Sequence, residues 1–250
     1  MFEVLDHGVR LAFIDEWPAA GRCEPILLIH GFASTHAVNW VLPQWVKTLT
    51  EAGRRVIAFD NRGHGRSEKF HDPAAYAMQK MAEDARVLLD HLGIATADVM
   101  GYSMGARIAA FFAKEHASRV RSMILGDLGH HLVDRAGLPL CHCRGNGGAL
   151  ARRSRRPAQR MFRAFAEATK SDLKALAAWR AGCPPSSERD RSRRNRCPRT
   201  DRGRNQGDVA GDPHQLAALF RRARAVDIPG RDHNRAVGDT VYKDSVLEFL

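Results

Sequence analysis

A serine between two glycines is the feature of this chain best suited to chemistry. The run Gly101-Tyr102-Ser103-Met104-Gly105 follows a short apolar stretch and precedes a helical pattern. This order predicts a strand, a sharp turn and a helix, in which Gly101 and Gly105 let strand and helix approach closely and leave the serine hydroxyl exposed. Ser103 would then stand at a helix N-terminus, whose free N–H groups favour a developing negative charge. The pattern indicates a nucleophilic serine.

Three further motifs accompany the serine, and their order and spacing are more specific than any one motif alone. They are Pro25–Phe32, an apolar run ending in His-Gly; Val56–Ser67, an apolar run followed by Asp-x-Arg-Gly-x-Gly-x-Ser; and Val226–His233, a short apolar run followed by Gly-x-Asp-His. With the serine motif they resemble the α/β-hydrolases over most of the chain. The resemblance implies an α/β fold with a mostly parallel central sheet, helices on both faces and a helical cap.

The resemblance also implies roles for individual residues. Ser103 would be the nucleophile, and His233, the late histidine that follows a strand and a Gly-x-Asp turn, the general base that takes its proton and returns it to the leaving group. The backbone N–H groups of Phe32 and Met104 would form the oxyanion hole. The other candidate histidines are expected in structural or solvated positions: His30, His64 and His214.

The carboxylate that would orient His233 is the one triad residue that the sequence does not place at its expected position. In the family a G-x-x-D turn carries it, and the position that would bear it here is Gly207. The adjacent Asp208 is the nominal candidate. Asp127, at the end of the strand expected at 120–126, is the alternative, because some family members place the acid there; a helix cap is its structural reading. Loss of a triad carboxylate commonly lowers turnover by about 10⁴, so an impaired enzyme is expected.

Hydrophobic periodicity predicts the elements that must position these residues, and it fits a parallel sheet covered on both faces. Strands are expected at 2–4 and 9–13 as a hairpin, and at 25–30, 56–60, 120–126 and 226–228; helices are expected at 42–52, 77–92, 157–179 and 213–220. The chain is therefore divided into core residues 1–133, a helical cap at 134–182 that covers the pocket, an irregular basic segment at 183–207 and core residues 208–250.

The formal net charge of +11 on 250 residues raises the question of nucleic-acid binding. The whole basic excess lies in residues 144–204, which carry 18 Lys and Arg against 5 Asp and Glu, while the rest of the chain carries 21 against 23. This segment has no aromatic residue after Trp179 and no amphipathic period. It therefore differs from a helix that binds in a DNA groove and from a surface on which single-stranded bases stack. We expect a small-molecule substrate, and neither nucleic acid nor a membrane, as the partner.

Residues 183–207 depart from the family pattern. They stand where the seventh strand is expected, yet they contain eight arginines and no large aliphatic residue. Such a segment cannot form a buried central strand, so a disrupted seventh strand is expected. Codons shifted by one base can encode apolar residues here, and we interpret the stretch as GC-rich DNA translated out of frame. A disordered basic insertion is the alternative, and the nucleotide sequence decides between them.

A serine nucleophile indicates acyl transfer to water. The resemblance thus implies a serine hydrolase acting on a small-molecule ester, thioester or lactone through an acyl-enzyme. It argues against epoxide hydrolase chemistry, for which this family uses an aspartate at the same place. Two alternatives stay open: a carbon–carbon bond hydrolase, which also uses a serine, and a non-catalytic or impaired ligand-binding protein on the same fold.

Neither a cofactor nor a metal is expected, because no metal, nucleotide or flavin motif is present. The five cysteines form no C-x-x-C pair and are expected to be free thiols. The chain does not open on a basic region followed by an apolar stretch, and no apolar run approaches the roughly 18 residues of a membrane span. A cytoplasmic location is therefore expected.

Overall fold

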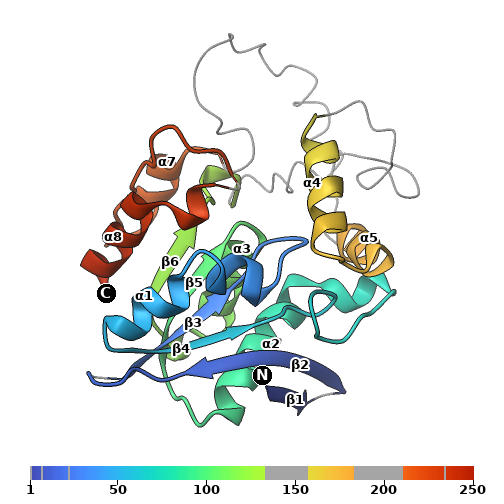
Figure 1. The fold of residues 1–250 in the computed structure, drawn as a ribbon, viewed down its shortest axis with the longest axis horizontal. Helices are drawn as coiled ribbons and strands as arrows, with labels where there is room; N and C mark the ends of the chain where they lie inside the picture. The colour runs from blue at the N-terminus through green and yellow to red at the C-terminus, as the bar shows by residue number, and fades with distance from the viewer. Residues whose placement is uncertain (1, 7, 22, 133–156, 183–210, 234) are drawn as a thin grey trace.

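The computed structural model describes residues 2–6, 8–21, 23–132, 157–182, 211–233 and 235–250. Its centre is a six-stranded sheet in the order β1-β2-β4-β3-β5-β6 (Figure 1). The strands are β1 (Phe2–Asp6), β2 (Val9–Glu16), β3 (Glu24–Ile29), β4 (Arg54–Phe59), β5 (Ala97–Tyr102) and β6 (Val120–Gly126). β1 and β2 form the expected hairpin, β2 pairs antiparallel with β4, and the remaining pairs are parallel.

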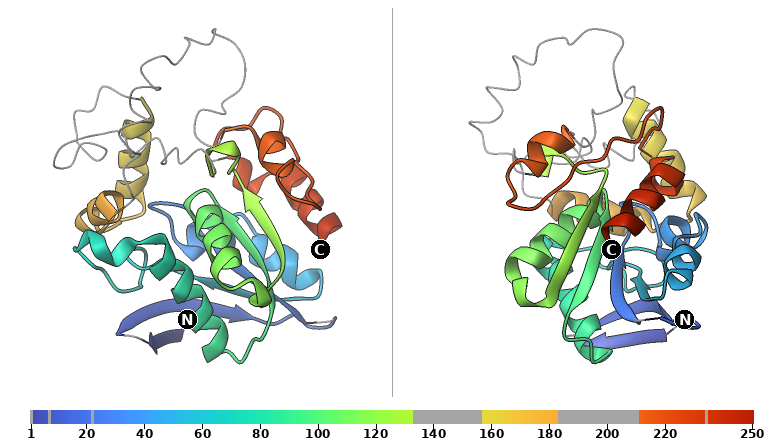
Figure 2. Two further views of the ribbon diagram at one scale, coloured as in Figure 1. Left: turned by 180° about the vertical axis from the view of Figure 1, so that it is seen from behind. Right: turned by 90° about the vertical axis from the view of Figure 1, so that its left-hand side faces the viewer.

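Helices cover both faces of the sheet (Figure 2). The α-helices are α1 (Trp45–Glu51), α2 (Met78–His91), α3 (Met104–Glu115), α4 (Pro157–Ala168), α5 (Leu173–Gly182), α7 (Pro213–Ala217) and α8 (Thr240–Phe249). Short turns of other helix types are η1 (Ala37–Val41), η2 (Pro73–Tyr76), η3 (Ala117–Arg119), η4 (His130–Leu132) and η6 (Ala236–Gly238). Among the described residues no helix is long and apolar enough to cross a membrane.

Strand β3 shows how the sheet joins two cores. The last four residues of the strand, Ile26, Leu27, Leu28 and Ile29, are fully buried, so both of its faces are covered. Successive side chains of a strand point to opposite faces. Leu27 and Ile29 accordingly pack in the cluster that holds α2 and α3, whereas Ile26 and Leu28 pack in the cluster that holds α1 and α8. A continuous apolar run is what a parallel strand covered on both faces requires.

The far edge of the sheet differs from the expectation. Residues 226–228 were expected to be a strand, but they pair with no described strand, and this prediction is wrong. Val226 and Ile228 are half-buried while Asp227 is exposed, and Ile228 packs against the α1–α8 cluster. The alternating apolar pattern of residues 226–228 therefore reflects which side chains are buried. A strand would also need a neighbouring strand to pair with, and none is described here. Among the described residues β6 has only β5 beside it, and its side chains are mostly half-buried.

Several helix boundaries also differ, each for a local reason. The helix expected at 157–179 is two helices, because Lys170 has a positive φ of 52° and Asp172 caps a new start, accepting from Lys174 N–H at 2.8 Å. The helix expected at 42–52 begins only at Trp45, after the π-helical turn η1. The helix expected at 213–220 ends at Ala217. Residues 134–156 of the expected cap and the basic segment 183–207 lie outside the described residues.

Candidate active site

Ser103 stands in a strained turn between β5 and α3. Its φ of 56° and ψ of −112° lie in a region that side chains rarely adopt, and its N–H donates to Gly126 O at 2.9 Å. Both flanking glycines are required by contact: a β-carbon on Gly101 would collide with the backbone of Gly105, and one on Gly105 with the backbone of Ile29. The strand, turn and helix expected around the serine are therefore present.

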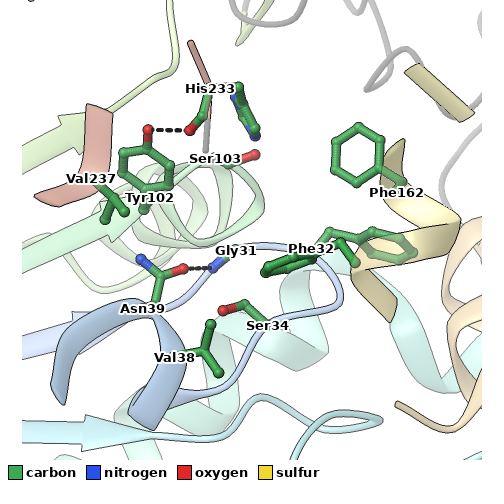
Figure 3. Close-up of a pocket in the computed structure, with 11 residues that line it drawn as sticks. Gly31, Phe32, Ser34, Val38, Asn39, Tyr102, Ser103, Phe162, His233 and Val237 are labelled. Atoms are coloured by element: carbon green, nitrogen blue, oxygen red, sulfur yellow. Dashed lines mark hydrogen bonds between the residues drawn. The ribbon is translucent and has the colours of Figure 1, made fainter. Parts of the chain in front are cut away.

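Ser103 opens into a cavity of about 80 Å³ at the carboxyl end of the sheet. Ser103 itself is 3% exposed, so its hydroxyl faces this cavity rather than open solvent. The side chains of Ser103 and His233 point toward one another (Figure 3). The lining residues are Gly31, Phe32, Ser34, Val38, Asn39, Tyr102, Ser103, Phe162, Phe165, His233 and Val237. Helix α4, part of the expected cap, thus contributes two aromatic side chains.

Two contacts position His233, one at its backbone and one at its ring. Its backbone oxygen accepts from the hydroxyl of Tyr102 at 2.6 Å, and its ring Nδ1 is in contact with Oδ2 of Asp127. Asp127 follows β6 directly and has a positive φ of 48°. The structure therefore brings Ser103, His233 and Asp127 together at one end of the parallel strands, where ligands of such sheets bind. Asp208, the nominal acid, lies outside the described residues.

Two backbone amides next to this region have no hydrogen-bond partner among the described residues. The N–H groups of Phe32, after β3, and Met104, the first residue of α3, donate no hydrogen bond to a described residue. The neighbouring Gly31 N–H is occupied, because it donates to Oδ1 of Asn39 at 3.0 Å. The ring centroid of Phe32 lies 4.7 Å from that of Trp179, so this loop packs against helix α5.

The other candidate histidines, His30, His64 and His214, do not line the cavity. His30 is fully buried; its Nδ1 donates to Gly31 O at 2.7 Å and its Nε2 accepts from Asn61 N–H at 2.9 Å. His64 is also fully buried and contacts Arg62 O through Nδ1 at 3.0 Å. Burial lowers the pKa of His30 to about 4 and that of His64 to about 3. His214 instead pairs with exposed Asp227 at 2.9 Å.

Acidification is expected to destabilise the protein through these two buried imidazoles. Their folded pKa values lie below the ordinary 6.5, so as pH falls the unfolded chain binds protons first. The free energy of unfolding is therefore unaffected by these two groups above about pH 6.5 and falls below it by about 1.4 kcal/mol per pH unit for each histidine, down to about pH 4 for His30 and about pH 3 for His64. We expect the free energy of unfolding to be about 4 kcal/mol lower at pH 5 than at pH 7.

Urea unfolding at the two pH values measures this difference. His71→Gln, which removes an exposed histidine, should show the same difference as the unmodified chain. Equal stability at pH 5 and pH 7 would show that the buried imidazoles are not the acid-sensitive groups.

Asn39 and Tyr102 line the same cavity, although no motif in the sequence singled them out. Asn39 stands eight residues after Gly31, and only the fold of the π-helical turn brings its amide back to the loop. Tyr102 occupies a variable position of the serine motif, and its contact with His233 spans 131 residues. Among the described residues, no group of three or more His, Cys, Asp or Glu is placed to hold a metal ion.

Comparison with known proteins agrees with the fold. The family model described as alpha/beta hydrolase fold matches residues 24–135. Epoxide hydrolase B of Mycobacterium tuberculosis is 32% identical over 118 residues, covering 47% of this chain and 32% of that protein. A 2-hydroxymuconate semialdehyde hydrolase of a Pseudomonas species is 36% identical over 127 residues, covering 49% and 41%. The matches therefore span less than half the length of these two relatives.

Among solved structures, a probable hydrolytic enzyme from Pseudomonas aeruginosa PAO1 matches the whole chain. The TM-score is 0.69 at 22% identity, and the match covers 100% of this chain and 93% of that one. This likeness shows a shared fold. With the motif order, the strained serine turn and the family match over 24–135, it leads to one conclusion: the chain has the α/β-hydrolase fold, and residues 24–135 match the model of that family.

Proposed function

We propose that the protein is a serine hydrolase that acts on a small-molecule ester, thioester or lactone through an acyl-enzyme. Ser103 is the nucleophile, His233 the general base and Asp127 the acid that orients it. The observation that carries the proposal is the contact of Asp127 with His233, a residue that lines the same cavity as Ser103. This arrangement is the nucleophile, base and orienting group of a triad.

The chemistry follows from the positions of these groups. The free Nε2 of His233 takes the proton of the Ser103 hydroxyl as its oxygen bonds to the acyl carbon. The amides of Phe32 and Met104 then hold the resulting oxyanion, each donor being worth roughly 3 kcal/mol in such sites. The imidazolium returns the proton to the leaving oxygen or sulfur, and the acyl-enzyme forms. The same imidazole then deprotonates a water, which attacks the acyl carbon. The acid leaves as the bond to Ser103 breaks, and the imidazolium returns its proton to the Ser103 oxygen.

The named relatives support hydrolysis but not one substrate. An epoxide hydrolase and a 2-hydroxymuconate semialdehyde hydrolase differ in the bond that they cleave. The serine at the turn favours acyl chemistry over epoxide opening, for which the family uses an aspartate there. The second relative keeps carbon–carbon bond hydrolysis as a competing proposal, because that reaction also uses a serine. A non-catalytic binding protein is the remaining alternative.

Short acyl chains are expected to be the best substrates. A cavity of about 80 Å³ is small beside the 300 Å³ or more of common ligand pockets, and Phe162 and Phe165 close one wall. With para-nitrophenyl esters of increasing chain length, we expect kcat/KM to be highest for acetyl to butanoyl and at least tenfold lower for octanoyl. Phe162→Ala should move the optimum to longer chains.

Hydrolysis of a vinylogous diketone without ester turnover would replace the proposal by carbon–carbon hydrolysis. A fluorophosphonate probe separates catalysis from binding alone, because it should label an activated Ser103 and leave a binding protein unmodified. Absence of both labelling and turnover would contradict the proposed function.

A further inference from the structure

The turn that carries the proposed oxyanion amide of Phe32 has a strained backbone. It is closed by Ser34 N–H, which donates to Gly31 O at 3.3 Å. Ala33, the third residue of this turn, has a positive φ of 57°, a conformation that favours glycine. Ala33 is also 0% exposed, so water cannot reach its carbonyl. A turn in a disfavoured conformation persists only when contacts from outside hold it there.

The contact that holds Ala33 comes from the end of helix α4. The hydroxyl of Thr169 donates to Ala33 O at 2.9 Å, across 136 residues of sequence. The same hydroxyl lies 3.1 Å from Phe165 O and 3.2 Å from Ala166 O, but each of these carbonyls already accepts a backbone N–H. Ala33 O accepts from no backbone N–H of a described residue. The single hydroxyl proton of Thr169 therefore satisfies a buried carbonyl that would otherwise lack a strong donor.

The direction of the Thr169 side chain is fixed by the way α4 ends. Ser171 N–H donates to Ala166 O at 2.9 Å, and Lys170 N–H donates to Glu167 O at 3.1 Å. Lys170 between them has a φ of 52°. These two bonds and the left-handed residue form a Schellman motif, in which Thr169 is the C-cap. The hydroxyl thus projects from a helix end of defined geometry.

Two further contacts join the same parts of the molecule. The hydroxyl of Ser171 lies 2.8 Å from that of Thr169, so it can donate to Thr169 while Thr169 donates to Ala33. On the other side of the turn, the ring of Phe32 packs against Trp179 of α5. The turn Gly31–Ser34 therefore contacts both α4 and α5, through a carbonyl and through a ring.

We propose that Thr169 is a positioning residue, whose hydroxyl holds the turn Gly31–Ser34 and thereby the Phe32 N–H in the geometry that receives the oxyanion. Helices α4 and α5 do more than form a wall of the cavity, because this geometry persists only while the end of α4 is docked on the turn. The effect on catalysis rests on the proposed function. The effect on the turn itself does not.

Thr169→Val tests the catalytic part, because valine keeps the shape of threonine but has no proton to donate. With para-nitrophenyl butanoate we expect kcat/KM to fall about tenfold, a fraction of the 10² to 10³ that loss of an oxyanion donor costs. Competitive inhibition by the para-nitroanilide of butanoic acid should change by less than about twofold, since ground-state binding does not use the oxyanion amide. Thr169→Ser, which keeps the hydroxyl, should restore most of the rate.

Hydrogen exchange of the Ser34 amide tests the position of the turn without any turnover, because this N–H closes the turn. We expect exchange about fivefold faster in Thr169→Val, the size of one net hydrogen bond. Thr48→Val is the matched control, since its hydroxyl donates only to Gln44 O, four residues earlier, at 2.8 Å. It should leave Ser34 exchange and kcat/KM unchanged. Ser171→Ala should shift both in the same direction by a smaller factor, and it provides the test if the valine variant does not fold.

Unchanged Ser34 exchange in both Thr169→Val and Ser171→Ala would overturn the inference. Faster exchange with an unchanged kcat/KM, or a loss of rate that Thr169→Ser does not restore, would overturn its catalytic part. Failure of the proposed function would show separately, as absence of ester turnover and probe labelling in the unmodified chain. Ser34 exchange would still decide whether Thr169 holds the turn.

Discussion

Replacing Ser103 by alanine should abolish ester hydrolysis and leave the fold intact. Removal of the nucleophile from a triad lowers kcat by roughly 10⁴ to 10⁶, because the remaining groups can only bind and polarise the substrate. The serine hydroxyl makes no hydrogen bond to a described residue, so its loss leaves no described buried group without a hydrogen-bond partner. Alanine has the same β-carbon at φ 56°, so the backbone strain of the turn is unchanged.

Initial rates with para-nitrophenyl butanoate and a thermal unfolding curve measure the two halves of this prediction. Ser245→Ala is the matched control, since its hydroxyl donates only to Val241 O on the exposed side of α8. Retention of more than about 1% of the rate in Ser103→Ala would remove Ser103 from the role of nucleophile.

Asp127→Asn should lower kcat by about 10⁴ with little change in stability. Asparagine has nearly the same shape, but its amide can offer an N–H to Nδ1 of His233 and so stabilise the tautomer that has lost its accepting Nε2. Asp127 is the carboxylate that contacts this ring in the structure, so the effect should appear here rather than at Asp208.

The matched variant is Asp208→Asn, for which we expect kcat within threefold of the unmodified chain. The rates of both variants, measured under saturating substrate, identify the acid directly. A large loss in Asp208→Asn together with a small one in Asp127→Asn would reverse the assignment and place the acid after the basic segment.

The sequence predicts best what depends on neighbouring residues. The turn around Ser103 and the strand Val120–Gly126 follow from local glycine placement and apolar runs, and both are present. The position of Asp127 against His233 joins residues far apart in the chain and depends on the positive φ of one aspartate, so the sequence left it as an alternative. Residues 226–228 show the opposite failure, because their pattern indicated burial but could not reveal that no described strand stands beside them.

The strand order separates the site into parts of unequal local stability. Phe32 and Ser103 follow β3 and β5, which have paired neighbours on both sides. Asp127 follows β6, which within the described residues is paired on one side only. Local opening of a protein begins where backbone pairing and burial are least complete. We therefore expect the proposed oxyanion amides and nucleophile to stand on the better-paired strands of the described sheet, and the proposed pair of His233 and Asp127 to depend on an edge strand that opens more readily. On warming, we expect the proposed ester hydrolysis to be lost at a lower temperature than that at which the sheet unfolds.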